Sequence, residues 1–348
     1  MDKMDIKSMS LEQLEKAFKG WNYRPYHALQ VYAWLHRGVE SFDDMTDISK
    51  QLRGELEKQY EIFNVSIVEK LTSKCDETIK YLLSLRDGAL IESVLMKYHH
   101  GYTICISTQV GCKMGCVFCA TGKMGFSRNL TASEMLSQIQ SAQADLGIRI
   151  SNVVLMGMGE PLDNYENTLI FLKLAASQKG MNIGMRHISV STCGIIDKIN
   201  DLAQRNISAT LSVSLHAPNN EIRDQILPIN KKFPVEELLS ACRDYAQMTK
   251  RRVTYEYTMI NNLNDSALCA KELANKIGGS LCHVNIIPIN QIDGNNCNKS
   301  QHDQIKLFCD ILLKKGISVT TRRSLGSDIN ASCGQLRARV KTSKILQQ

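Results

Sequence analysis

Residues 110–126 read VGCKMGCVFCATGKMGF and carry three cysteines, Cys112, Cys116 and Cys119, in the spacing C-x-x-x-C-x-x-C. Three thiolates on one short loop suit an iron–sulfur cluster, and a four-iron cluster held by three thiolates keeps one iron open for a ligand. A structural zinc site usually takes four ligands in two close-spaced pairs, and the sequence has no second pair nearby. The alternatives are a zinc loop completed by a distant residue, or three unrelated thiols.

The bulk composition bounds the class of protein. The chain has 348 residues, 43% of them hydrophobic, with twelve cysteines and a formal net charge of +7. In a cytosolic chain, cysteines more often bind metal, catalyse or lie buried than form disulfides. The N-terminal segment is polar, and no apolar run approaches the ~20 residues that span a bilayer. We therefore expect a cytoplasmic protein, and its charge permits an acidic partner such as nucleic acid without requiring one.

Short β-branched runs alternate with helix-like segments from residue 102 onward. The runs lie at 103–107, 152–156, 187–191, 209–214, 252–258 and 282–287, with a further candidate at 317–321. This alternation predicts βαβ units and a parallel sheet, hence an α/β fold. Six units are too few for a closed eight-fold barrel, so a partial barrel or an open doubly wound sheet fits. The cysteine loop follows the first strand of the series.

The pattern also predicts a division of the chain. A capping box at Ser10 and helices over 26–36 and 48–59 indicate a helical accessory domain over residues 1–62. Two β-rich runs around Arg86-Asp-Gly88 predict a hairpin segment over 63–100. The core domain is expected over 101–340 and a C-terminal tail over 341–348.

Polar and glycine residues stand at the ends of several predicted strands. In a βα fold the carboxyl ends of the strands meet at one rim, where ligands bind. Each position alone is explained by a turn or a cap, but their joint position favours a ligand site. They are Gly159 and Glu160 after the second strand, Ser191 after the third, Ser214 and His216, with Leu215 between them, after the fourth, and Asn290 after the sixth.

Four segments carry a resemblance to a known family. The cysteine spacing, with Phe118 before the last cysteine, resembles the signature of the radical S-adenosylmethionine (SAM) superfamily. The segments CVFCATGKMGFSRNLT, MGMGEPLDN (156–164), SVSLHAPNNEIRDQILPIN (212–230) and SDINASCGQL (327–336) closely resemble the RlmN/Cfr family of RNA adenine methyltransferases. The resemblance covers about residues 10–340. It implies a partial (β/α)6 barrel with the helical domain and hairpin as extensions, one 4Fe–4S cluster on the three cysteines, and two SAM molecules per turnover, held by the rim residues.

The resemblance also implies roles for three further residues. Cys333 is the thiol that is methylated on sulfur, Cys105 is the resolving thiol that forms a transient disulfide with Cys333, and Glu92 is the proton acceptor. From chemistry alone, Cys333 beside a glycine is a possible nucleophile, Cys105 is an inert cysteine in a buried strand, and Glu92 is an ordinary exposed strand carboxylate.

By this resemblance the expected activity is methylation of C2 of adenosine 2503 in 23S rRNA and of adenosine 37 in tRNAs. The alternatives are C8 methylation of the same rRNA adenosine, which confers antibiotic resistance, and a non-catalytic iron–sulfur RNA-binding regulator. Pro161 after Glu160 and the Ala217-Pro218 pair are the spellings of the C2 branch. The expected partners are the two RNAs and a one-electron reductant of the flavodoxin or ferredoxin type, with no membrane and a monomeric state.

Lysines and arginines are the expected contacts to the RNA backbone. The candidates are Lys123 and Arg128 near the cysteine loop, Lys250, Arg251 and Arg252, Arg322 and Arg323, and Arg337 and Arg339. Those near Cys333 and the cysteine loop are favoured because they adjoin the reacting centre.

Overall fold

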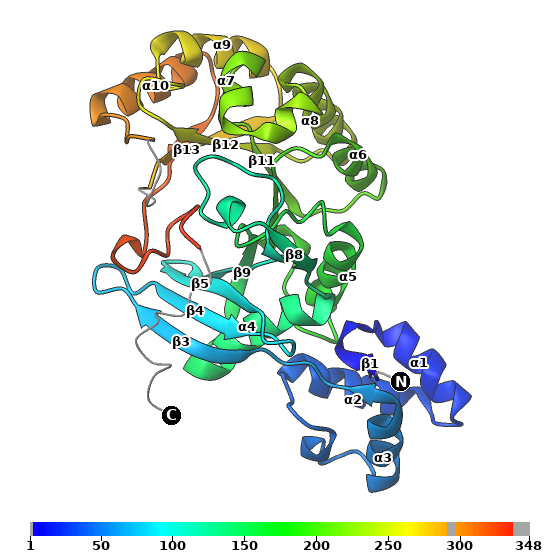
Figure 1. Cartoon of the computed structure of the whole chain (residues 1–348). Coiled ribbons are helices and arrows are strands. Elements are labelled where there is room, and N and C mark those ends of the chain that lie inside the picture. The colour runs from blue at the N-terminus through cyan, green and yellow to red at the C-terminus, as the bar shows by residue number, and fades with distance from the viewer. Residues whose placement is uncertain (1–2, 291–296, 337–348) are drawn as a thin grey trace.

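A ten-stranded mixed sheet forms the centre of the molecule (Figure 1). The computed structural model describes residues 3–290 and 297–336. The parallel strands are β6 (Gly101–Cys105), β9 (Ile150–Leu155), β10 (Ile188–Thr192), β11 (Thr210–Ser214), β12 (Val253–Met259), β13 (Cys282–Pro288) and β14 (Val319–Thr321). All seven expected runs form strands, and the α/β fold class is confirmed.

The order of these strands decides between the two expected architectures. They lie side by side in chain order, β6-β9-β10-β11-β12-β13-β14, and every neighbouring pair is parallel. A doubly wound sheet would reverse its order at a switch point, whereas successive right-handed crossovers in one direction wind the sheet into a barrel. The core is therefore a partial barrel of six βα units followed by a last strand, β14, at the edge of the sheet, as expected.

Helices connect the parallel strands and bury the apolar side chains between them. They are α4 (Ala132–Leu146), α5 (Tyr165–Ala176), α6 (Ile196–Gln204), α7 (Asn220–Ile226), α8 (Val235–Thr249), α9 (Ala267–Ile277) and α10 (His302–Lys314). The predicted capping box opens α4: the Thr131 side chain accepts a hydrogen bond from Glu134 N at 3.2 Å, and the Glu134 carboxylate accepts one from Thr131 N at 2.9 Å. Such a box satisfies backbone donors that the first helical turn leaves open.

An antiparallel extension continues the sheet beyond β6. It contains β5 (Leu90–Tyr98), β4 (Ile79–Ser84) and β3 (Ser66–Thr72), in that order from β6 to the sheet edge. The predicted turn at Arg86-Asp-Gly88 joins β4 to β5, and Gly88 has a φ of +78°, which glycine adopts readily. The hairpin is confirmed, with β3 as a further strand.

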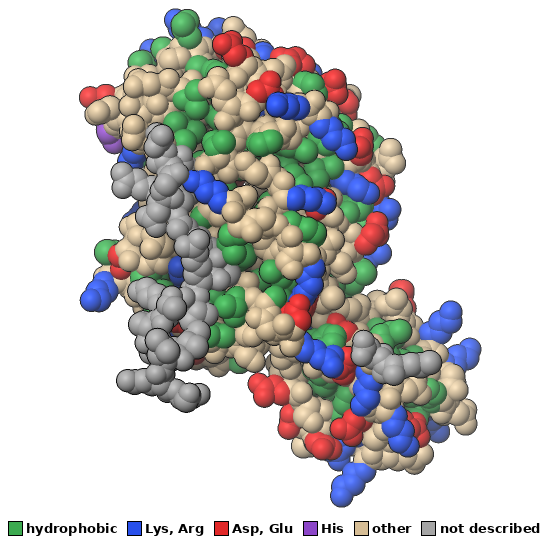
Figure 2. All heavy atoms as spheres, in the orientation of Figure 1, with side chains coloured by type: hydrophobic (Ala, Val, Ile, Leu, Met, Phe, Trp, Pro, Cys, Tyr) green, Lys and Arg blue, Asp and Glu red, His purple; other side chains and the backbone are tan. Residues whose placement is uncertain are grey.

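The N-terminal helices form a smaller lobe beside the core (Figures 1 and 2). They are α1 (Leu11–Gly20), α2 (Pro25–Arg37) and α3 (Lys50–Gln59), with β1 (Met4–Asp5) paired to β2 (Tyr60–Glu61). The Ser10 capping box is confirmed. The buried Lys7 ammonium attaches this lobe to the core, since it donates to Asn64 Oδ1 and to Ser137 Oγ of α4, both at 2.6 Å.

The surface carries no obvious gathering of one sign of charge in the view of Figure 2, where Lys and Arg side chains alternate with Asp and Glu over both lobes. Among the residues that the structure describes, no helix has the length and apolar character needed to cross a membrane. The expected tail at 341–348, and the RNA-contact candidates Arg337 and Arg339, lie outside the described residues.

Candidate active site

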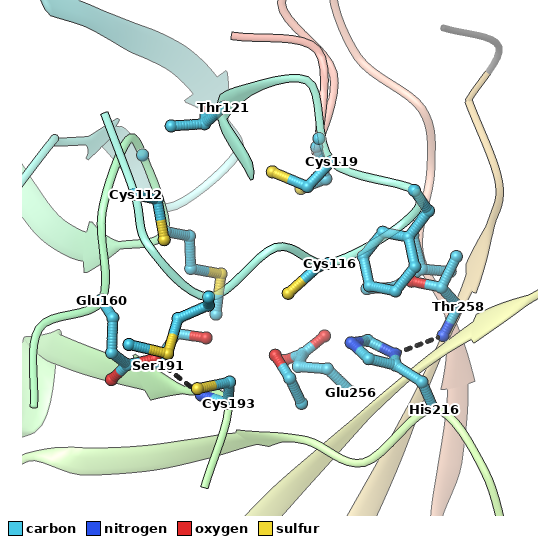
Figure 3. A pocket seen from close by; sticks show the side chains of 18 of the residues that line it. Cys112, Cys116, Cys119, Thr121, Glu160, Ser191, Cys193, His216, Glu256 and Thr258 are labelled. Carbon is cyan, nitrogen blue, oxygen red and sulfur yellow. Dashed lines mark hydrogen bonds between the residues drawn. The ribbon is translucent and has the colours of Figure 1, made fainter. Parts of the chain in front are cut away.

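The cysteine loop lies at the carboxyl rim of the barrel, just after β6. A short hairpin of β7 (Gln109–Gly111) and β8 (Phe126–Asn129) flanks it. Hydrogen bonds fix its backbone: Val117 N donates to Ile226 O at 3.1 Å, and Ala120 N donates to Gly334 O at 2.7 Å. The second bond ties the loop to the segment that contains Cys333. The thiols of Cys112, Cys116 and Cys119 point toward a common space (Figure 3).

The donor set fits a four-iron cluster better than a single ion. In residues 3–290 and 297–336, no three His, Cys, Asp or Glu side chains are grouped as the ligands of one metal ion. A cubane takes one thiolate per iron, so its three cysteines surround the cluster rather than meet at a point. The three cysteines line one wall of a cavity that measures about 950 Å³ with the open space at its mouth included, and strand ends of the barrel line the rest. With only these three thiolates to hold it, a cluster bound there would keep one iron open for a ligand.

Six of the seven rim residues expected to hold SAM line this cavity. They are Gly159, Glu160, Ser191, Ser214, His216 and Asn290. The exception is Leu215, whose side chain is fully buried in the core and whose N–H donates to Glu256 O at 3.1 Å. Alternation along the chain turns Leu215 inward while its neighbours Ser214 and His216 face the cavity, so Leu215 could contact a ligand only through its backbone.

Glu160 is a buried carboxylate held by backbone donors. Its Oε2 accepts from Cys193 N at 2.7 Å and its Oε1 accepts from Leu162 N at 2.9 Å. Burial raises the pKa of Glu160, and these backbone hydrogen bonds oppose the rise. Each carboxylate oxygen has a second lone pair, so Glu160 can still accept a hydrogen bond from the amino group of a ligand in the cavity.

The glycines before Glu160 are required by close backbone approach. A Cβ at Gly157 would lie 2.6 Å from Ile106 O, and one at Gly159, where φ is +104°, would lie 2.6 Å from the Gln109 side chain. Because Gly159 has no side chain, the Gln109 side chain can pack against the turn. Its Oε1 accepts a hydrogen bond from Glu160 N at 2.9 Å. The Gly-Glu turn is thus packed against β7 rather than solvated.

His216 enters the cavity in a fixed tautomer. Its Nδ1 accepts a hydrogen bond from Thr258 N at 2.9 Å, so the ring proton is on Nε2 (Figure 3). Its backbone is left-handed, with a φ of +57°, which turns the chain after β11. Phe118 packs edge-on against the ring, with centroids 4.7 Å apart. Burial lowers the pKa of His216 to about 3, so the ring is a neutral donor at physiological pH.

The sequence did not predict three residues of this site, two that line the cavity and one behind its rim. Glu256 of β12 is buried there and accepts from Asn285 Nδ2 at 2.8 Å, while Cys193 lies beside Glu160 (Figure 3). Arg223 is fully buried behind the rim and donates to the carbonyl oxygens of Cys193 at 2.7 Å and Ser214 at 3.1 Å. A carboxylate in the middle of a β-rich run was the one available signal for Glu256; an arginine in a helix resembles any surface cation.

A second cavity, of about 540 Å³ with its open space included, adjoins the first, and Cys333 lines both. Cys105 lines only the second cavity, so the structure brings Cys105 and Cys333 to one space although they are far apart in sequence. Burial raises the pKa of Cys105 to about 12, the proximity of Cys333 adds to the rise, and Arg322 opposes it. Both thiols are free, and Cys333 is half-buried, with its carbonyl oxygen accepting from Asn290 Nδ2 at 3.2 Å.

The sequence suggested Arg322 as a contact to the RNA backbone on an outer surface. The structure instead places it at this centre. Its side chain lines both cavities, and its N–H donates to Ile286 O at 2.8 Å, which extends the edge of the sheet. Interaction with Cys333, and then with Glu256, raises the pKa of its guanidinium. Arg322 therefore provides a fixed positive charge between the two cavities.

Glu92 lies close to these cavities but lines neither. It is buried on β5, in a separate pocket with Lys80 and Asn330, and not exposed as an ordinary strand carboxylate would be. Strand alternation places it on the same face of β5 as Val94 and Met96, which line the Cys105 cavity.

The remaining RNA-contact candidates divide by position. Arg128 donates to both Asp87, at 2.7 Å, and Glu134, at 2.8 Å, and so joins the hairpin turn to α4 instead of facing solvent with a free charge. Residues 250–252 precede β12 and therefore lie at the opposite end of the barrel from the cavities. Lys123 is on the cysteine loop, and Arg323 is exposed beside the second cavity.

Comparison with known proteins places this site in a family. The model of the radical SAM superfamily matches residues 106–270, and that of the ribosomal RNA large subunit methyltransferase N-terminal domain matches residues 4–62. A protein of Clostridium tetani named probable dual-specificity RNA methyltransferase RlmN is 48% identical over 97% of this chain and 96% of its own length. One of the same name from Alkaliphilus oremlandii is also 48% identical, over 97% of this chain and 98% of its own.

A solved structure agrees with these relatives. A radical SAM methyltransferase from Sphaerobacter thermophilus matches with a TM-score of 0.92 and 42% identity, over 97% of this chain and all of the other. The cofactors of such an enzyme are a 4Fe–4S cluster and SAM, and the residues around the first cavity fit both. This chain therefore belongs to the RlmN family of the radical SAM superfamily.

Proposed function

We propose that this protein methylates C2 of adenosine in RNA, taking adenosine 2503 of 23S rRNA and adenosine 37 of tRNAs as substrates, by a ping-pong route through Cys333. The observation that carries the proposal is that Cys333 forms part of the wall of both cavities, one lined by the cluster cysteines and the other by Cys105. A thiol accessible from both sides can receive a methyl group from one and deliver it to the other. The names of the relatives, dual-specificity RNA methyltransferases, support RNA as the acceptor.

The chemistry explains why a protein thiol takes part. C2 of adenine is not nucleophilic, so a direct polar transfer from SAM is blocked. When bound, the cluster and SAM supply a carbon radical by one-electron cleavage of the sulfonium. The chain's own part is to present a methyl group to that radical, and we assign this to Cys333, which first accepts the group from SAM as a thiolate. The Arg322 guanidinium lines both cavities together with Cys333.

Release of the product is assigned to Cys105 and Glu92. After the methylene carbon on Cys333 has bonded to the ring, Cys105 attacks the Cys333 sulfur. The disulfide forms, and the electron pair of the carbon–sulfur bond leaves with the carbon, which takes up a proton to become the methyl group. Glu92 accepts the ring proton from C2, and the unpaired electron that the radical addition left on the ring passes to a one-electron acceptor, the oxidised form of the redox partner that supplied the first electron. The place of Glu92 on the same face of β5 as Val94 and Met96, which line the Cys105 cavity, supports this role, and Asn330 of the loop that carries Cys333 lines its own pocket.

The wider setting is also part of the proposal. Residues 1–62 act as an accessory RNA-binding domain, 63–100 as a connecting hairpin, and 101–340 as the catalytic core. The protein works as a cytoplasmic monomer, and an external one-electron reductant of the flavodoxin or ferredoxin type supplies the single electron; reduction of the disulfide after each turnover takes two further electrons and two protons.

The product decides the function. RNA fragments treated with cluster-loaded protein, SAM and a strong reductant are digested and compared by mass spectrometry with synthetic C2- and C8-methyladenosine. We expect the C2 product; the C8 product would overturn this choice. Absence of deoxyadenosine release from SAM would favour a non-catalytic RNA-binding regulator. The variant Cys333→Ala should bind SAM and transfer no methyl group.

A further inference from the structure

A third hollow continues the cavity that contains Cys105 and Cys333 to the protein surface. This outer hollow is bounded by Lys74, Lys97, Tyr98 and Arg323, among others, and measures about 850 Å³ with the open space above it included. It shares Tyr98, Arg323 and Leu325 with the Cys105 cavity. The shared residues therefore form the boundary between the reacting centre and the outside.

Tyr98 presents an aromatic face at this boundary. It ends β5 with 36% of its surface exposed, and the hairpin turn places the His100 ring parallel to its own, with centroids 5.2 Å apart and planes at 10°. His99 packs edge-on against His100 at 4.9 Å. Partial burial raises the pKa of the Tyr98 phenol, so the ring is uncharged at neutral pH. A small platform of stacked rings thus stands next to the cavity, and both histidines are exposed.

The charges around the hollow suit a phosphate backbone on one side only. Lys97 is paired with Glu77 at 3.1 Å, and the Asp76 carboxylate accepts from Gly326 N at 2.8 Å. Arg323 and Lys74 are both exposed, and Arg323 lies directly at the boundary with the Cys105 cavity. The side of the hollow next to the reacting centre is therefore the cationic one.

We propose that Tyr98, backed by His100, is the stacking site for a nucleotide adjacent to the target adenosine, and that Arg323 contacts the phosphate between them. This rests on the proposed function, because it requires an adenosine to enter the Cys105 cavity. A base that reacts inside a cavity must leave its stack, and the neighbour then loses its own stacking partner. Proteins that bind single-stranded RNA replace that partner with an aromatic ring and hold the backbone with arginine.

The geometry favours stacking of the adjacent nucleotide, and not of the target adenosine, on Tyr98. The target ring must reach Cys333, which lies on the wall shared with the cofactor cavity, whereas Tyr98 lies on the wall shared with the outer hollow. Lysine and arginine alone would attract RNA without ordering it, and the ring supplies the ordering contact.

The test uses cluster-loaded protein with SAM and no reductant, so that RNA binds without radical chemistry. The RNA is a tRNA anticodon stem-loop carrying 2-aminopurine on either the 5′ or the 3′ side of the target adenosine. We expect wild-type protein and Tyr98→Phe to quench the fluorescence of one of the two probes. Tyr98→Leu should lose that quenching and bind the RNA roughly 10- to 100-fold more weakly, the usual range for a lost base–aromatic stack. Arg323→Gln should reduce the salt slope of binding by about one.

Each outcome is decisive. Methylation of Cys333 by SAM without RNA, read from the intact mass of the protein, checks that each variant is folded and separates this proposal from the previous one. If wild-type protein does not methylate Cys333, the proposed function is wrong. If Cys333 is methylated but Tyr98→Leu matches wild type in affinity and in quenching of both probes, the stacking site is wrong.

Discussion

Lys80 joins the carboxylate of Glu92 to the loop that carries Cys333. Its ammonium nitrogen lies 3.3 Å from Glu92 Oε1 and donates to the carbonyl oxygen of Asn330 at 3.2 Å. Lys80 is on β4, Glu92 on the neighbouring strand β5, and Asn330 only a few residues before Cys333. Both side chains of the ion pair are largely buried. The ion pair therefore holds the Glu92 carboxylate in place beside the loop that carries Cys333.

Replacement of Lys80 by Met should therefore slow the removal of the ring proton by about 10- to 100-fold, part of the ~10²- to 10⁴-fold that a general base contributes. The conservative Lys80→Arg should keep most of the rate. Single-turnover assays that start from pre-methylated protein measure this step alone. Equal rates for Met, Arg and wild type would remove Lys80 from the reaction.

Replacement of Cys105 by Ala should stop the reaction after the carbon–carbon bond has formed. Without a second thiol, the bond from the Cys333 sulfur to the methylene carbon has no nucleophile to break it, so protein and RNA stay joined. We expect a covalent complex on denaturing gels that contains one RNA per protein and disappears in Cys105/Cys333 double variants. Full turnover by Cys105→Ala would show that another group releases the product.

Replacement of Gly159 by Ala should weaken SAM binding and the fold together. The new Cβ would meet the Gln109 side chain at 2.6 Å, on a backbone with φ of +104°. We expect a loss of about 1–3 kcal/mol in the free energy of unfolding. Gly279→Ala is the matched control, because φ is +75° there but no atom lies within 4 Å. Urea denaturation and SAM titration of both variants check this; similar losses in the two would mean that backbone strain, and not the clash with Gln109, dominates.

His36 should make the protein less stable in acid. Its ring is buried in α2 against Tyr32, with centroids 4.2 Å apart, and burial lowers its pKa to about 4, with a further contribution from Lys7. In the unfolded chain an ordinary histidine binds its proton near pH 6.5. Between pH 6.5 and 4 the unfolded state therefore binds more protons than the folded state. The free energy of unfolding thus decreases as the pH is lowered through this range, by at most about 3 kcal/mol.

The variant His36→Gln isolates that contribution from the other acid-sensitive groups. Above pH 6.5 the ring is neutral in both states, and the difference between wild type and variant should be constant. Below it, wild-type stability should fall more steeply than that of the variant when both are followed by urea denaturation. Parallel curves across this range would show that His36 keeps a similar pKa in the folded and unfolded states.

Much of the architecture follows from local pattern. The strands from 103 to 321, the capping boxes at Ser10 and Thr131, and the turn at Gly88 all depend on neighbouring residues, through alternation, helix-end donors and the backbone freedom of glycine. The rim residues could be predicted because parallel strands place their carboxyl ends together. Leu215 marks the limit of that rule, since the rim position alone does not decide whether a side chain faces the cavity or the core.

The sequence by itself determined the chemistry of the three-cysteine loop, because the short covalent segment that joins the three cysteines keeps their thiols near one another. Only the tertiary structure decided that Cys105 and Cys333 share a cavity, that Arg322 is a charge inside it, and that Glu92 is paired with Lys80. Each of these relationships is between segments that are distant along the chain. They depend on the path by which the last loop returns across the sheet from β14 to the hairpin, and no local pattern encodes that path (Figure 1).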